Sequence, residues 1–287
     1  MTASAQNLGQ TIENGQQEKI WQVIVIGSGF AGLGAAIKLR EAGLHDFIVL
    51  EKSNELGGVW RENTYPGCAC DVPSSLYSYS FAPNPNWSRV FAEQAEIKAY
   101  LQKVAHDYGV IPHIRMQQEM LDAAWDNQQN LWRIKTQDQE YQARFVIMAC
   151  GPMHEPVYPN IKGIEQFKGT IFHSARWRHD YDLTGKRVAV IGTGASAIQF
   201  VPKIQPKVAE LVLFQRTPQW ILPKLDQALP PIAQKLFKHL PLTQLAMRGA
   251  IYTIFETLNG GMHHPSVMKQ FQRLALFNLH RTVKDPV

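Results

Sequence analysis

The sequence predicts an α/β fold with two Rossmann-like βαβ units, the second of which is incomplete. Residues 21–52 and 185–217 have the same build: an apolar β-branched run, a glycine-rich turn, a helical stretch and a second apolar run. A charged residue also follows each turn at one distance, because Glu51 lies 24 residues after Gly27 and Arg216 lies 24 residues after Gly192. This internal repeat predicts two dinucleotide sites rather than two merely structural glycine turns.

Composition limits the classes of function. The chain has 287 residues, of which 45% are apolar and 18% charged, with a formal net charge of +5. This is the profile of a soluble globular protein, and the length suits two domains. Lysine and arginine are spread along the chain without the basic block that grips a phosphate backbone, so we expect no nucleic-acid partner.

The three cysteines predict neither a disulfide framework nor a metal site. Cys68 and Cys70 are separated by one residue, which is not a zinc spacing, and Cys150 is remote. A sparse, odd cysteine count fits a reducing compartment. We therefore interpret these thiols as inert and expect no bound metal.

Neither end of the sequence predicts membrane association. Residues 1–19 are polar and lack the apolar stretch of a signal peptide, so we expect a flexible tail. The most apolar late run, Leu245–Leu258, carries two charges and is too short to span a bilayer. A cytoplasmic protein with no membrane span is expected.

The first unit is expected to be a domain of residues 20–160. Its strands are predicted at Val23–Ile26, Phe47–Leu50 and Phe145–Ala149, the last of which ends in small residues suited to a nearby cofactor. A further glycine pair within Glu55–Trp60 is suited to close approach of a bulky ring system.

Each position of the first turn, Gly27-Ser28-Gly29-Phe30-Ala31-Gly32, has a physical role. The first glycine permits the tight turn, and the second lets a pyrophosphate approach the backbone. The third must be small because helix and strand pack closely there; Ala197 holds this place in the second turn. The following helix N-terminus offers free N–H groups to phosphates.

The charges that end the two units differ in sign. A carboxylate at Glu51 would accept hydrogen bonds from ribose hydroxyls and repel a 2′-phosphate, which predicts FAD or NAD in the first site. Arg216, assisted by the Thr217 hydroxyl, would pair with a 2′-phosphate, which predicts NADPH in the second. A solvated strand-end charge is the other interpretation of Arg216. A flavin and a nicotinamide together indicate hydride exchange.

The second unit is expected to be a partial domain of residues 161–220, followed by a helical segment of the same domain at 221–287. Strands are predicted at Arg187–Ile191 and Leu211–Phe214. The third strand that should follow is replaced by proline-broken, helix-like sequence, so the second sheet is expected to be unfinished.

These residues resemble the type I Baeyer–Villiger monooxygenases. Phe167–Trp177 fits the family fingerprint F-x-G-x-x-x-H-x-x-x-W, although Arg178 stands where the family has proline or aspartate. Gly57–Phe81 is similar to the flavin-contact segment, and Phe214–Trp220 to the NADPH loop. The resemblance implies FAD and NADPH as cofactors, and O2 and an organic ketone as substrates. The ketone would become an ester or lactone through a flavin C4a-peroxide; oxidation of nitrogen or sulfur is the alternative.

The resemblance and the glycine turns together assign residues to both cofactors. For FAD these are Gly27, Ser28, Gly29, Gly32, Glu51, Lys52, Gly58, Val59, Trp60, Cys70, Asp71, Tyr77 and Met120. For NADPH they are Gly192, Thr193, Gly194, Ala195, Ser196, Arg216 and Thr217.

Two residues are implied in catalysis. Asp71 matches the family aspartate that positions a peroxide-stabilising arginine, although Asp71-Val72-Pro73 could equally cap a helix. His173 matches the fingerprint histidine of the hinge between cofactor domains, and a hydrogen-bonded structural histidine is the competing interpretation. For the aromatic residues Trp177, Trp60 and Tyr77, packing in the core is the alternative to a role in the site.

The resemblance ends before the parts that complete such an enzyme. Family members are longer, and no arginine here matches the catalytic one. One hypothesis is therefore an inactive or destabilised fragment, which an assay of NADPH oxidation with FAD and simple ketones would test. A pyridine-nucleotide disulfide reductase is a further alternative, but the Cys68/Cys70 spacing does not suit a redox pair.

Overall fold

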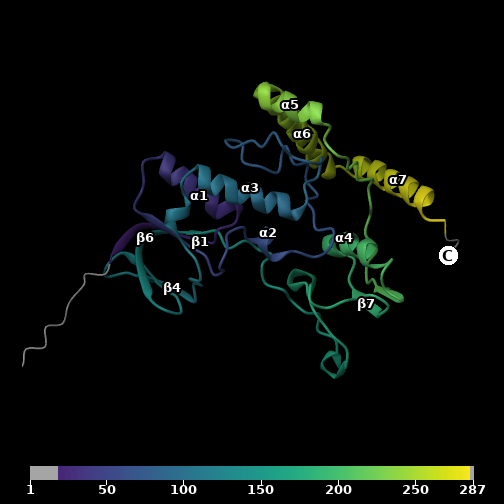
Figure 1. Ribbon diagram of the computed structural model, residues 1–287, viewed down its shortest axis with the longest axis horizontal. Coiled ribbons are helices and arrows are strands. Elements are labelled where there is room, and N and C mark those ends of the chain that lie inside the picture. Colours follow the sequence, from purple (N-terminus) through teal and green to yellow (C-terminus); the bar gives the residue numbers. More distant parts are fainter. Residues whose placement is uncertain (1–18, 285–287) are drawn as a thin grey trace, which may run out of the picture.

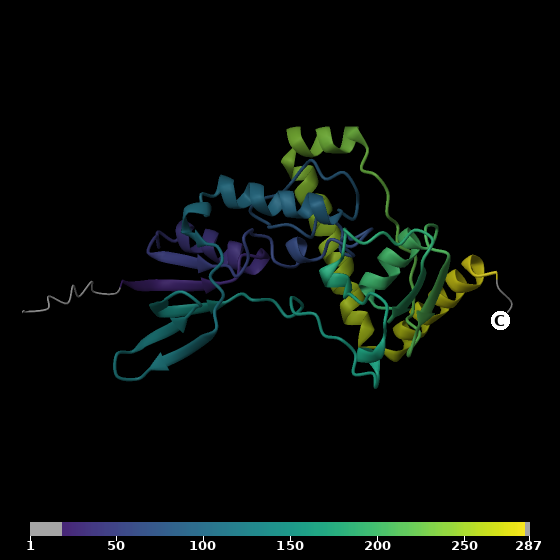
Figure 2. The same cartoon turned by 60° about the horizontal axis from the view of Figure 1, so that its bottom comes forward.

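The computed structural model describes residues 19–284, so the tail predicted for residues 1–19 lies outside it except for Lys19. Its strands form a six-stranded sheet and a separate two-stranded sheet. The first sheet lies on the left and the second on the right in both views of the molecule (Figure 1 and Figure 2). The predicted α/β class with an incomplete second unit is confirmed.

The first sheet has a parallel half built around β1 (Ile20–Ile26). It pairs in parallel with β2 (Phe47–Leu50) on one side and with β6 (Glu140–Met148) on the other. All three predicted strands are therefore confirmed, and β6 begins earlier than expected. The short strand β3 (Ile114–Arg115), which was not predicted, extends the parallel half beyond β2.

The other half of the sheet is an antiparallel hairpin that the sequence pattern did not reveal. Strands β4 (Asp122–Asp126) and β5 (Leu131–Lys135) pair with each other, and β5 pairs with β6. The Asp126 carboxylate accepts hydrogen bonds from the backbone N–H groups of Gln128 and Gln129, which shapes the turn. Asn130 completes it at a φ of 54°.

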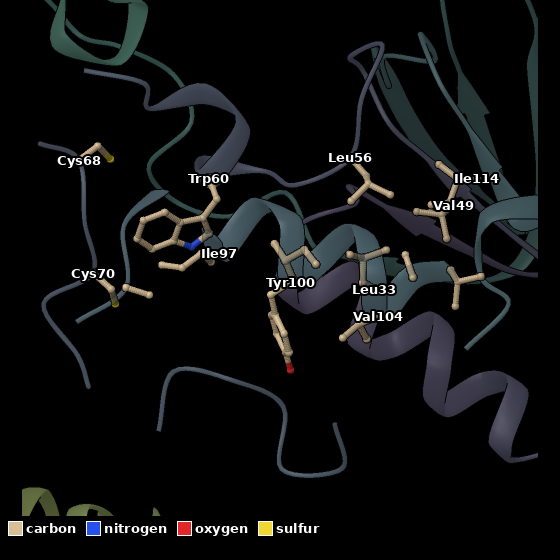
Figure 3. Close-up of a cluster of buried hydrophobic side chains, with 14 of the residues drawn as sticks. Leu33, Val49, Leu56, Trp60, Cys68, Cys70, Ile97, Tyr100, Val104 and Ile114 are labelled. Carbon is tan, nitrogen blue, oxygen red and sulfur yellow. The ribbon is translucent and has the colours of Figure 1, made fainter. Parts of the chain in front are cut away.

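Helices cover one face of the parallel half. The apolar faces of α1 (Phe30–Glu41) and α3 (Gln94–Asp107) pack on the sheet together with the short helix α2 (Val59–Glu62). Figure 3 shows Leu33, Val49, Trp60 and Tyr100 in this core. Burial of these side chains holds the carboxyl ends of β1 and β2 in place.

The second unit is a single βαβ element. Strand β7 (Arg187–Ile191) leads through a glycine turn into α4 (Ala195–Ile204), and β8 (Glu210–Phe214) returns to pair in parallel with β7. Both predicted strands are confirmed. Short 3-10 helices at Ile111–His113, Ile164–Gln166 and Ser174–Arg176 lie in the connections of the chain.

The C-terminal helices α5 (Pro231–His239), α6 (Pro241–Met262) and α7 (Pro265–Thr282) each begin with a proline. Within the segment 221–287 predicted to be helical, the helices begin at Pro231, and residues 221–230 are not helical. Its hydrogen bonds reach the first unit: the Gln244 side chain donates to Asn84 O at 2.7 Å, and the Arg248 guanidinium donates to three carbonyl groups of residues 75–78. None of the helices in residues 19–284 is long and apolar enough to cross a membrane.

Candidate functional site

The turn between β1 and α1 has the close packing that its glycines predict. Gly27 adopts a φ of +101°, and a Cβ there would lie 2.7 Å from the carbonyl oxygen of Ala149. A Cβ on Gly32 would lie 1.8 Å from the carbonyl oxygen of Gly27. Any larger residue at these two places would push α1 or β6 away from β1.

A second glycine loop meets this turn from the other side. Gly58 has a φ of +55°, and a Cβ there would lie 3.0 Å from the Cα of Gly29. Gly29 is the N-cap of α1, whose first turn consists of apolar residues, so its backbone N–H groups can receive an anion. The two loops together form a cradle of peptide groups at the carboxyl end of the sheet.

A cavity of about 360 Å³ opens from this cradle. Ten of the thirteen residues predicted for FAD line it: Gly27, Ser28, Gly29, Glu51, Lys52, Gly58, Val59, Trp60, Tyr77 and Met120. Gly32 instead supports the turn from behind. Cys70 and Asp71 are not among the lining residues of the cavity.

Glu51 closes one end of the cavity. Its side chain is 5% exposed, and its carboxylate accepts hydrogen bonds from the Ser28 hydroxyl, from Ser28 N at 3.0 Å and from Ser53 N at 3.0 Å. These bonds fix an anionic acceptor beside the first turn. A nucleotide ribose presents the hydroxyl donors that such a carboxylate accepts.

Aromatic side chains form another wall. The Trp60 indole N–H donates to the Tyr77 hydroxyl at 3.0 Å, and the two rings meet edge to face with centroids 5.5 Å apart. Phe30 lies 5.0 Å from the Tyr77 ring. Trp60 and Tyr77 both pack in the hydrophobic core and line the cavity, so the two interpretations are compatible.

Several lining residues were not predicted: Phe30, Arg61, Glu62, Gln118, Glu119, Met153 and His154. Gln118 and Glu119 follow β3, so recognition of that short strand beside β2 would have placed them at this edge. Glu62 pairs with two arginines, Arg61 and Arg176, the latter at 2.7 Å. Arg176 belongs to the fingerprint segment, and this ion pair joins that segment to the cavity mouth.

Asp71 does not cap a helix. It is exposed, and the residues that follow form a turn at Ser74–Leu76, so the helix-cap interpretation is wrong. The turn is closed by hydrogen bonds from Leu76 N and Tyr77 N to Pro73 O. Burial raises the pKa of the Tyr77 hydroxyl, and the charge of Asp71 raises it further.

The cysteine loop lacks the properties of a redox pair. Cys68 and Cys70 are both buried and free. Burial raises the pKa of Cys68, and raises that of Cys70 to about 11. At neutral pH both groups are protonated thiols, whereas dithiol chemistry requires a thiolate.

His173 makes the local hydrogen bond of a structural histidine. It caps the 3-10 helix Ser174–Arg176, where its Nδ1 accepts from Ala175 N at 3.1 Å. Burial and then the charge of Arg176 lower the pKa of His173, so the neutral, accepting form is favoured. Trp177 packs against Phe200 of α4 with ring centroids 5.2 Å apart, as its packing interpretation expects.

The second turn has the geometry of the first. Gly192 also adopts a φ of +101°, and Gly194 is the N-cap of α4, as Gly29 is of α1. The Gln215 side chain donates to the Thr193 hydroxyl at 3.2 Å, so the end of β8 lies against this turn. Arg216 and Thr217 follow directly and are exposed, which leaves the guanidinium accessible to a ligand at the turn.

Known proteins are similar to this chain in sequence. Residues 24–257 match the family model described as pyridine nucleotide-disulphide oxidoreductase. The chain is 50% identical over 275 residues to a Baeyer-Villiger monooxygenase of Streptomyces coelicolor, covering 96% of this chain and 53% of that protein. A Baeyer-Villiger monooxygenase of Pseudomonas aeruginosa is 50% identical over 267 residues, covering 92% and 51%.

Solved structures agree with the sequence relatives. The closed crystal structure of cyclohexanone monooxygenase has a TM-score of 0.71 at 32% identity and covers 77% of this chain and 43% of that one. OTEMO in complex with FAD and NADP has a TM-score of 0.71 at 33% identity, covering 82% and 44%. The chain therefore spans about half the length of the proteins it matches.

Proposed function

Because this chain belongs to the pyridine nucleotide-disulphide oxidoreductase family and is homologous to Baeyer–Villiger monooxygenases, we propose that it supplies the cofactor sites of an FAD- and NADPH-dependent monooxygenase. The observation that carries the proposal is that two similar turns are followed by residues of opposite charge. A buried carboxylate stands at the first turn and an exposed guanidinium at the second.

The first site fits FAD. The glycine cradle and the N-terminus of α1 would receive the pyrophosphate, and Glu51 would accept from the adenosine ribose. The aromatic wall of Trp60 and Tyr77 offers apolar surface for the flavin. A matched solved structure, OTEMO, carries both FAD and NADP by its description, which supports the same pair here.

The second site fits NADPH. Gly192, Thr193, Gly194, Ala195 and Ser196 would surround the pyrophosphate at the start of α4. Arg216 and Thr217 would bind the 2′-phosphate, which NADH lacks. A bound flavin would take up the hydride of NADPH and activate O2 for insertion beside a carbonyl group.

The substrate in this proposal is an organic ketone, converted to an ester or lactone. Its support is the description of both 50%-identical relatives as Baeyer–Villiger monooxygenases. Oxidation of nitrogen or sulfur is the second candidate within the same chemistry. Disulfide reduction, which the family description also names, is disfavoured by the protonated, buried thiols of Cys68 and Cys70.

Two residue roles and the location of the protein belong to the proposal. Asp71 would position a cation near the aromatic wall, and His173 would order the fingerprint segment between the two cofactor domains. The domain limits 20–160, 161–220 and 221–287 are retained with one modification: α5 and α6 bind the first unit through hydrogen bonds. A cytoplasmic location completes the proposal.

Visible absorption of the purified chain tests the proposal. We expect a bound oxidised flavin that NADPH bleaches under anaerobic conditions and NADH does not. Ketone conversion with O2 is then followed by product analysis, with an amine and a thioether as parallel substrates. Failure to bind flavin would overturn the proposal, and product from the thioether alone would favour the second candidate.

A further inference from the structure

A side-chain amide of the second unit binds the backbone of the first. Gln199 lies on α4, and its Nε2 donates to Ala69 O at 3.0 Å while its Oε1 accepts from Ala69 N at 3.2 Å. The same Oε1 also accepts from the Tyr65 hydroxyl at 3.1 Å. The Gln199 amide oxygen thus accepts two hydrogen bonds and its NH2 group donates one, all with Tyr65 and Ala69 of the loop Tyr65–Cys70 in the first unit.

The loop is oriented to receive this amide. Ala69 forms an antiparallel bridge with Glu93, in which Cys70 N donates to Ala92 O and Gln94 N donates to Cys68 O. The N–H and C=O of Ala69 therefore face the opposite way, toward α4. Gln199 pairs with Ala69 there as a neighbouring strand would.

The surrounding packing makes this approach close and fixed. Gly67 has a φ of +80°, and a Cβ there would lie 2.9 Å from the carbonyl oxygen of Gln199. The buried Phe200, next to Gln199, meets the Tyr65 ring edge to face at 6.1 Å. Burial raises the pKa of Tyr65 to about 12, so its hydroxyl remains a donor throughout the neutral range.

We propose that Gln199 is a positioning residue that joins the helix of the second nucleotide turn to the Tyr65–Cys70 loop, and so fixes the relative position of the two cofactor sites. Gln199 lies in the second turn of α4, the helix whose N-terminus forms the NADPH site of the proposed function, on which this inference rests. The loop continues into Asp71 and the aromatic wall of the flavin cavity. Hydride transfer requires both sites to be held at one distance, and a misplacement of about 1 Å can cost roughly 100-fold in rate.

Hydrogen exchange tests the contact between Gln199 and Ala69 without any cofactor. In Gln199→Leu we expect the Ala69 amide to exchange at least about fivefold faster, because its acceptor is lost. Gln205→Leu is the matched control, since Gln205 is exposed at the end of the same helix. Equal exchange of the Ala69 amide in both variants would overturn the inference.

Flavin reduction by NADPH gives the second readout. In Gln199→Leu the bleaching rate at saturating NADPH should fall about 100-fold, while the half-saturating concentration changes less than about threefold. An unchanged saturating rate, or an equal fall in Gln205→Leu, would contradict a positioning role. If NADPH does not bleach the flavin of the unaltered chain at all, the proposed function fails. Hydrogen exchange then still decides whether Gln199 joins the first and second units.

Gln199→Glu separates positioning from general destabilisation. A neutral carboxyl has the shape of the amide and can donate to Ala69 O. A carboxylate cannot donate, and its negative charge repels the partially negative carbonyl oxygen of Ala69. Protection of the Ala69 amide, corrected for intrinsic exchange, should therefore be weak near pH 8 and return below about pH 4 as the carboxyl takes up its proton. Protection independent of pH would count against the pairing geometry.

Discussion

The two βαβ units of this chain have the same turn in different surroundings. Gly27 and Gly192 share a φ of +101°, and their backbone N–H groups donate to the ends of the neighbouring strands at 2.8 and 2.9 Å. Yet a Cβ on Gly27 would meet Ala149 O, whereas a Cβ on Gly192 would meet no atom of residues 19–284 within 4 Å. The local sequence sets the turn, and the neighbouring strand sets how tightly the turn is enclosed.

The strands differ in the same way. Val23 to Ile26 of β1 are all buried because β2 and β6 flank the strand, helices cover Val23 and Val25, and Ile24 and Ile26 pack in a second cluster on the other face of the sheet. In the second sheet Ile191 is 56% exposed and Phe214 55% exposed, although both end apolar runs of the same kind. A strand becomes core only when another element covers it, so apolar pattern predicts the strand but not its burial.

The largest expected effect tests the helix–strand contact of the first unit. Gly32→Ala should cost more than about 4 kcal/mol of unfolding free energy, because its Cβ would lie on the Gly27 carbonyl oxygen. Ala197→Gly at the matching place of the second unit should cost only about 1 kcal/mol through helix propensity. Chemical denaturation measures both, and similar losses in the two variants would remove the contrast between the units.

Alanine at the first glycine of each turn isolates the effect of enclosure. Gly27→Ala should lose about 3 kcal/mol or more, from backbone strain and from the clash with Ala149 O. Gly192→Ala should lose about 1–2 kcal/mol, from strain at the same φ alone. Thermal unfolding of the two variants gives the difference, and a greater loss at Gly192 would reverse our interpretation.

Neutralising the buried acceptor of the first site should weaken flavin binding. Glu51→Gln keeps the size of the side chain but places its NH2 group against the N–H of either Ser28 or Ser53, so we expect a loss of about 2–3 kcal/mol in FAD affinity. Quenching of flavin fluorescence on titration reports the affinity. Glu55→Gln, at an exposed glutamate paired with Lys98, is the control and should leave it unchanged.

Removing the exposed cation of the second site should alter coenzyme preference. Arg216→Ala should reduce the preference for NADPH over NADH by roughly 10- to 100-fold, the value of a charge-assisted hydrogen bond. The comparison uses flavin bleaching at limiting concentrations of each coenzyme. The control is Arg187→Ala, at the start of β7 where Arg187 pairs with Glu210, and it should keep the preference for NADPH. An unaltered preference in Arg216→Ala would favour the interpretation of Arg216 as a solvated strand-end charge.

The smallest effect is expected in the Tyr65–Cys70 loop of the first unit. Cys70→Ser should change the bleaching rate by less than about twofold, because a thiol whose pKa is raised to about 11 stays protonated and takes no redox part. Since the thiolate forms only as the pH rises toward 11, the rate should show no thiol-dependent step between about pH 6 and 9. Loss of bleaching in the variant would revive the disulfide reductase alternative.

The sequence revealed most of the parallel framework and only part of the site. The five strands it predicted are present, and ten of thirteen residues assigned to FAD line one cavity. It missed β3, which has two residues, and the β4–β5 hairpin, whose alternation is too short and too polar to register. Gln118 and Glu119 were missed with β3, since only pairing with β2 brings them to the cavity.

By itself, the sequence determined the two glycine turns, the charge that follows each and the helices they open, because these depend on backbone freedom and side-chain type within about 30 residues. Only the tertiary structure decided that Gln199 meets Ala69, that Glu62 meets Arg176, and that α6 binds the loop of the first unit. Each of these contacts joins residues more than 100 positions apart. Their geometry depends on how packed elements are placed, which no local pattern specifies.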